Sequence, residues 1–117
     1  MKNEEYEEAA EEVRITEEQA KYHIEMMESL ERLYNNKDFK KVFMDGYFKE
    51  EASRLVLLRA DHNIQQEEKT VQSIDDKIIG IGELRQFMLT VFARGRQMRE
   101  AVAEANEYAE NVYNDKE

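Results

Sequence analysis

Small and apolar residues recur at alternating steps of four and three positions along the last third of the chain. These residues, here called the seam, are Leu84, Met88, Val91, Gly95, Met98, Val102, Ala105, Ala109 and Val112. The spacing places them on one face of an α-helix, and such a face is normally buried against other helices. The pattern therefore predicts one long packed helix. Its side chains become smaller towards Ala109, which lets a partner backbone come close.

Helical periodicity also extends over most of the remaining chain. The expected elements are an acidic N-terminal arm or helix at 1–15, a helix at 16–35, a short helical pair at 37–60 and a long helical region at 64–113. Turn signals separate them at Asn35–Asp38 and Asp61–Asn63, because Asn and Asp cap helices and tolerate tight turns. We expect Asn63 to cap the helix that begins at Ile64.

Two glycines interrupt the last of these regions. Gly80 and Gly82 flank Ile81, and each glycine costs roughly 1 kcal/mol in a helix interior relative to alanine. The pair predicts a break at 80–82 or a close crossing with another helix. Gly46 similarly predicts that the short helical pair stops or bends there.

The composition agrees with a helical fold. The 117 residues include no proline and four glycines, and 41% are hydrophobic. Proline and glycine are unfavourable inside helices, so their scarcity favours long helices over a turn-rich β fold. A chain of this length suits one domain. We therefore predict a single all-α domain, a helical bundle or hairpin with one long C-terminal helix.

Charge is distributed unevenly along the chain. The net charge is -10, with eleven acidic residues in 1–31 and six in 100–117, whereas 32–99 is slightly basic. An acidic chain is repelled by nucleic acid and by anionic membranes. No apolar stretch resembles a secretory signal or a membrane span. The separation of charge is compatible with protein partners, either head-to-tail copies or a basic protein. The simpler explanation, solvated helix faces together with an acidic tail, is the one that the sequence favours.

Signatures of catalysis, metals and cofactors are lacking in the sequence. There is no cysteine, and His23 and His62 are preceded three residues earlier by Ala20 and Arg59, not by the glutamate of a di-iron motif. Gly80-Ile81-Gly82 lacks the remaining glycine and lysine of a phosphate-binding loop. We therefore expect a non-enzyme that uses no metal and no cofactor.

Two groups of side chains are candidates for protein contact. Arg94, Arg96 and Arg99 cluster where the seam narrows, and arginine binds carboxylates through paired N–H donors. They can equally be ordinary charges beside the seam. The second group is aromatic and comprises Phe39, Phe43, Tyr47 and Phe48. These rings form domain core unless the surrounding helices leave them uncovered, in which case they suit an interface.

Four stretches together resemble a known group of proteins. They are Leu30–Val42 (LERLYNNKDFKKV), Asp45–Ala52 (DGYFKEEA), Arg54–Val56 (RLV) and Ile79–Arg85 (IGIGELR). The chain resembles small acidic helical proteins that tailed bacteriophages encode among their virion and assembly genes. The resemblance covers about residues 30–90 and implies a virion component or an assembly factor. It carries no catalytic signature and transfers no functional residue.

The expected function is therefore structural. We expect a non-enzymatic phage protein, in the virion or the host cytoplasm, whose seam and three arginines pack against further copies or against capsid, portal or tail components. The alternatives are an acidic mimic of nucleic acid that inhibits a host DNA-binding protein, and a transient assembly chaperone. A mimic needs rows of exposed carboxylates at phosphate-like spacing, whereas an assembly protein needs exposed apolar seam residues.

Overall fold

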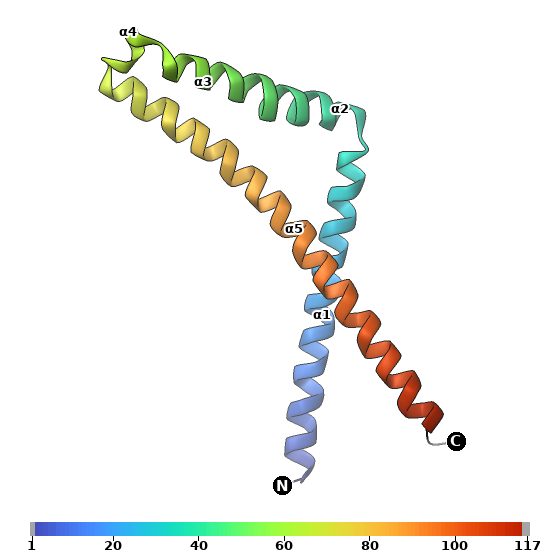
Figure 1. Ribbon diagram of the computed structural model, residues 1–117. Helices are drawn as coiled ribbons and strands as arrows, with labels where there is room; N and C mark the ends of the chain where they lie inside the picture. The colour runs from blue at the N-terminus through green and yellow to red at the C-terminus, as the bar shows by residue number, and fades with distance from the viewer. Residues whose placement is uncertain (1, 116–117) are drawn as a thin grey trace. The chain divides into compact units, whose positions relative to one another are not determined.

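The computed structural model describes the backbone of residues 2–115 and the side chains of residues 17–114. Its elements are α1 (Lys2–Tyr34), α2 (Lys37–Phe39), the π-helix η1 (Lys40–Glu51), α3 (Ala52–Ala60), α4 (His62–Gln65) and α5 (Glu68–Asp115) (Figure 1). The described backbone contains no strand. The predicted all-α fold with one long C-terminal helix is thus confirmed.

The helix α1 ends at the predicted asparagine turn. The side chain of Asn35 donates to the carbonyl oxygen of Glu31 at 3.1 Å. Asn36 has an extended backbone, and its side-chain oxygen accepts from the backbone N–H of Phe39 at 2.9 Å. Asn36 therefore caps α2, because it satisfies one of the donors that a helix start leaves unpaired.

The short helical pair expected at 37–60 is one helical segment whose hydrogen bonding changes along its length. The residues that flank η1, Phe39 and Ala52, both keep right-handed helical dihedral angles. Gly46 neither stops the helix nor separates two helices. A Cβ at Gly46 would stand 3.2 Å from the carbonyl oxygen of Lys41. Glycine at this position therefore avoids a tight contact with that oxygen inside the π-helix.

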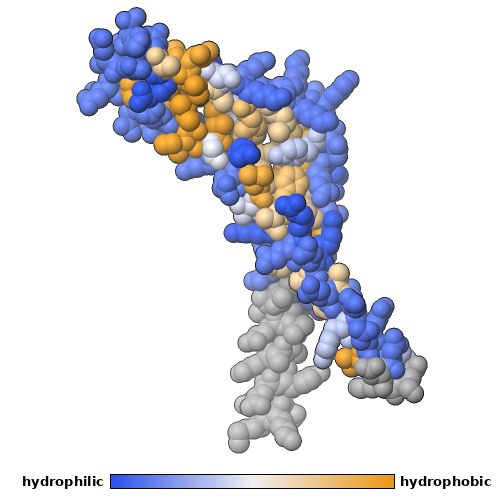
Figure 2. All heavy atoms as spheres, viewed as in Figure 1, coloured by the Kyte–Doolittle hydropathy of each residue, from blue (hydrophilic) through white to orange (hydrophobic). Residues whose placement is uncertain are grey.

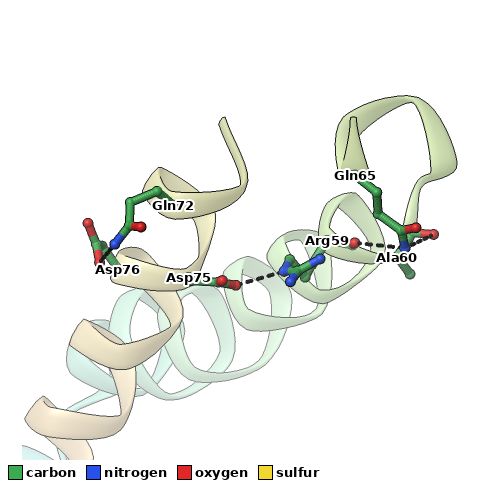
Figure 3. Close-up of polar contacts among 6 residues, drawn as sticks. All are labelled: Arg59, Ala60, Gln65, Gln72, Asp75 and Asp76. Carbon is green, nitrogen blue, oxygen red and sulfur yellow. Dashed lines mark hydrogen bonds and ion pairs between the residues drawn. The ribbon is translucent and has the colours of Figure 1, made fainter. Parts of the chain in front are cut away.

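The turn after α3 differs from the expectation in one residue. Asp61, not Asn63, is the cap: its backbone is extended, and its carboxylate accepts from the N–H of Asn63 at 2.8 Å. The side-chain amide of Gln65 lies 3.5 and 3.4 Å from the carbonyl oxygens of Arg59 and Ala60, at the end of α3 (Figure 3). The helical region expected from Ile64 is consequently divided, with α4 first and α5 after it.

The glycines at 80 and 82 do not interrupt α5. The helix runs without a break from Glu68 to Asp115, and a Cβ at Gly80 or Gly82 would meet nothing within 4 Å. The expected break or close crossing at 80–82 is therefore wrong. The cost of two glycines is small compared with the stability of a helix that is anchored by buried residues on one side, such as Ile74 and Ile81.

Contacts within the chain group into two compact units, residues 31–90 and residues 1–30 with 91–117. In the first unit, α3 and the first half of α5 form a helical hairpin around buried Leu55, Ile74 and Ile81. Partly buried residues that pack on this core are Tyr47, Phe48, Ala52, Leu58, Ile64 and Ile78. Arg59 Nε donates to Asp75 Oδ1 at 2.8 Å and joins the two arms of the hairpin (Figure 3).

In the other unit, α1 and α5 cross at Met27 and Gly95. Met27 is fully buried, and Ala20, Val91 and Gly95 are buried as well. A Cβ added to Gly95 would come within 2.7 Å of Sδ and 2.9 Å of Cγ of Met27, much closer than van der Waals contact. The narrowing of the seam at Gly95 therefore allows the close approach of α1.

We predict that Gly95→Leu lowers the free energy of unfolding by about 1–3 kcal/mol, because the new side chain overpacks the crossing at Met27. Gly82→Ala is the matched control, since the same helix has open space there and alanine has the higher helix propensity. It should raise the free energy of unfolding by up to about 1 kcal/mol. Denaturant titration measures both. Equal effects of the two substitutions would contradict a tight crossing.

Candidate protein-interaction surface

The seam is divided into a covered part and an open part. Met88, Val91 and Gly95 are buried, and Leu84 and Met98 are half-buried. The seam residues from Val102 to Val112 are exposed, with 39% exposure at Val102 and 37% at Val112. We call Val102, Ala105, Ala109 and Val112 the distal seam. The chain itself covers the first part, which leaves the distal seam as the candidate surface for another protein.

The last turns of α5 are amphipathic. Every residue from 101 to 114 is exposed, and Tyr108 and Tyr113 lie beside the distal seam on the apolar face. Helical periodicity places the glutamates on the opposite face and at its borders. They are Glu100, Glu104, Glu107 and Glu110, and no Lys or Arg occurs between residues 100 and 115.

A hollow of about 410 Å³ lies beside the start of the distal seam, between α1 and α5. Its lining residues, which we call the acidic hollow, are Glu17, Lys21, Ile24, Glu25, Glu28 and Val102. The side chains of Ile24 and Val102 are apolar, and three carboxylates surround them. Lys21 Nζ is 3.9 Å from Glu25 Oε1. With three glutamates and one lysine, the lining residues carry an excess of negative charge.

The three arginines predicted as contact residues differ in their ion-pair partners. All are exposed, and Arg99 Nη2 lies 3.9 Å from Glu28 Oε1 on α1. Arg99 thus faces a carboxylate of its own chain, and an exposed pair at this distance contributes little to stability. Arg94 and Arg96 form no ion pair with any side chain of residues 17–114.

The aromatic group forms a row in the hairpin unit. Ring centroids are 5.7 Å apart for Tyr34 and Phe39, 5.1 Å for Phe39 and Phe43, 6.5 Å for Phe43 and Tyr47, and 5.4 Å for Tyr47 and Phe48. Tyr47 and Phe48 pack on the core, whereas Phe43 is exposed. The row is therefore part of the core at its Tyr47–Phe48 end, half-buried at Tyr34 and Phe39, and exposed at its middle ring, Phe43.

Sequence reasoning missed a groove at the end of this row. Its lining residues are Tyr34, Met44, Phe48, Ile81, Arg85 and Leu89. Figure 2 shows apolar residues gathered along the hairpin and reaching the surface on the viewed face. The pairing of η1 with α5 creates the groove, and no periodicity within a single segment could have revealed that pairing.

The histidine and carboxylate side chains are the described groups that could bind a metal ion or transfer a proton. Among residues 17–114, no group of three or more His, Asp or Glu could hold a metal ion. His23 contacts the ring of Tyr22 edge to face, with centroids 5.3 Å apart. A hydrogen bond from Arg54 lowers the pKa of Glu51, and the same bond raises the pKa of Arg54. The two residues are three positions apart on the exposed surface of one helical segment, and their pKa shifts come from this local ion pair.

No described helix is both long enough and apolar enough to cross a membrane. The comparisons with protein-family models, curated proteins and solved structures found no match to this chain.

We predict that Val102→Thr and Val91→Thr differ in their effect, although both replace a methyl group by a hydroxyl on the same helix face. Val91 is buried, so the hydroxyl loses water there and should cost about 1–3 kcal/mol. Val102→Thr should change the free energy of unfolding by less than about 0.5 kcal/mol. Thermal or chemical denaturation of the two variants measures the difference. A large loss for Val102→Thr would mean that the distal seam is already covered.

Proposed function

We propose that the chain is a non-enzymatic structural or assembly protein that works by packing exposed helix faces against other protein. The observation that carries the proposal is the imbalance of apolar burial. Among the side chains of residues 17–114, seven hydrophobic residues are buried, whereas thirteen large hydrophobic residues are exposed by more than a third. Scattered exposed apolar residues are common, but a continuous apolar face such as the distal seam with Tyr108 and Tyr113 is typical of an interaction surface.

Energetics support this role. Full burial of a Val, Leu, Ile or Phe side chain contributes about 1.5–3 kcal/mol, so covering several of these residues supplies part of the favourable free energy that offsets the cost of association. Both compact units carry such residues: Leu57 and Ile79 on the hairpin, and Val102 and Val112 on the distal seam. The chain therefore has surfaces for more than one protein neighbour.

The proposed setting is the assembly of a tailed bacteriophage, in the virion or the host cytoplasm. It is supported by the sequence resemblance over residues 30–90. The partners proposed are further copies of the chain, or capsid, portal or tail proteins. A transient assembly chaperone would use the same surfaces and would be missing from finished particles.

One observation favours the alternative of a nucleic-acid mimic. Glu100, Glu104 and Glu107 form a row along α5, with axial steps of about 6 and 4.5 Å from the helical rise. The row occupies a single helix, and the same helix exposes the apolar distal seam. A mimic has no use for that apolar face, so we favour the assembly role.

The molar mass of the purified chain tests the proposal. We expect either a mass above the 13.9 kDa of one chain in light scattering, or co-sedimentation of the chain with phage particles. A monomer that binds nothing from a virion preparation would contradict the proposal. Binding to a host DNA-binding protein in competition with DNA would support the mimic instead.

We predict that replacing Arg94, Arg96 and Arg99 together by Ser weakens this assembly most strongly at low salt. The Debye length falls from about 30 Å at 0.01 M to about 8 Å at physiological ionic strength, so contacts with carboxylates are screened as salt is added. Sedimentation at several ionic strengths measures the effect. A loss that does not depend on salt would show that the arginines contribute packing and not charge.

A further inference from the structure

The distal seam and the acidic hollow form one continuous surface, because Val102 belongs to both. Val102 lies with Ile24 in the hollow, and it is also the first residue of the distal seam. From Val102 to Val112 the helix rises about 15 Å, which is nearly three turns. The surface is therefore long enough to receive a helix of three to four turns.

Negative charge borders this apolar surface on both sides. Glu17, Glu25 and Glu28 line the hollow; Glu25 lies 3.9 Å from Lys21 and Glu28 lies 3.9 Å from Arg99, so three carboxylates face two cations and a net negative charge remains. Further along α5, Glu104 and Glu110 lie on opposite borders of the apolar face, next to Ala105 and Ala109. Lysine or arginine side chains that flank an apolar stripe would reach these carboxylates while the stripe covers the distal seam.

A second copy of this chain does not fit the same surface. The unit formed by residues 1–30 and 91–117 contains sixteen acidic and seven basic residues. Pairing two copies through their distal seams would bring Glu104 and Glu110 of each copy close to those of the other. Such like-charge repulsion opposes association, whereas a basic partner is attracted and is steered to the surface.

We propose that the distal seam and the acidic hollow dock a basic amphipathic helix of another protein. The inference rests on the proposed function and adds the chemical class of one partner. The apolar stripe of the partner supplies the buried area, and its flanking cations pair with the glutamates. Charge thus decides which helix binds, and apolar contact provides most of the affinity.

Two synthetic helical peptides of about 20 residues test the proposal, a length at which isolated helices form in water. Both carry the same Leu and Ala stripe; one has Lys and the other Glu at the flanking positions. We expect the full chain to bind the Lys peptide at least about tenfold more tightly at low salt, and this advantage should shrink as the Debye length falls. Fluorescence anisotropy measures both affinities. Equal affinities, or no binding of either peptide, would overturn the proposal.

Variants of the chain show whether binding occurs at this surface. Val102→Asp should reduce affinity for the Lys peptide at least tenfold. Val42→Asp is the matched control, because Val42 is 58% exposed but lies in the hairpin unit, and it should leave binding unchanged. Glu104→Lys combined with Glu110→Lys should shift the preference towards the Glu peptide. Circular dichroism confirms that each variant is helical.

Three outcomes would contradict the inference. The first is an equal loss of affinity in Val42→Asp and Val102→Asp, and the second is an unchanged peptide preference in the charge-reversed variant. The third is a dimer that Val102→Asp converts to a monomer, because a second copy would then occupy the surface. If the chain joins particles or oligomers but ignores the Lys peptide, this inference fails and the proposed function stands. If it binds the Lys peptide but never assembles, the proposed function fails.

Discussion

The close approach of α1 and α5 at Met27 and Gly95 is the contact on which the unit of residues 1–30 and 91–117 depends. A side chain at position 95 would occupy the space of Met27, so the crossing exists only because the seam contains a glycine there. Burial of Met27 fixes which face of α5 is turned towards α1. The same geometry decides which seam residues are covered by the chain and which remain exposed beyond Met98. A local steric condition thereby defines the candidate interaction surface.

Features encoded by short stretches of sequence were predictable. The alternating four- and three-residue spacing of the seam in α5 and the asparagine cap at Asn36 follow from neighbouring residues alone. The break predicted at Gly80 and Gly82 was wrong, because helix propensity is a weak preference that packing around Ile74 and Ile81 overrides. Asp61 and Asn63 are both good caps, and the choice between them depends on the backbone turn and not on residue type.

The location of the exposed surface was harder to predict. Periodicity shows which residues share a face, but it does not show how far along the face a neighbouring helix extends. Only the crossing point separates Val91, which is buried, from Val102, which is not. The acidic hollow likewise combines residues of α1 with one residue of α5 that lies 74–85 positions further along the sequence. Such contacts depend on tertiary pairing, which the residue pattern of one sequence does not specify.

The continuity of α5 has a thermodynamic consequence for its exposed end. A separate peptide of the fourteen residues from 101 to 114 would form a helix of only marginal stability. Ordering the first turn costs conformational entropy for several residues and gains only one hydrogen bond in return. In the intact chain the preceding turns of α5 are already helical and are fixed by the buried residues Val91 and Gly95, so no new helix has to be nucleated. The end of α5 grows by propagation alone. A protein that docks there meets a preformed helix and need not supply the free energy of folding one.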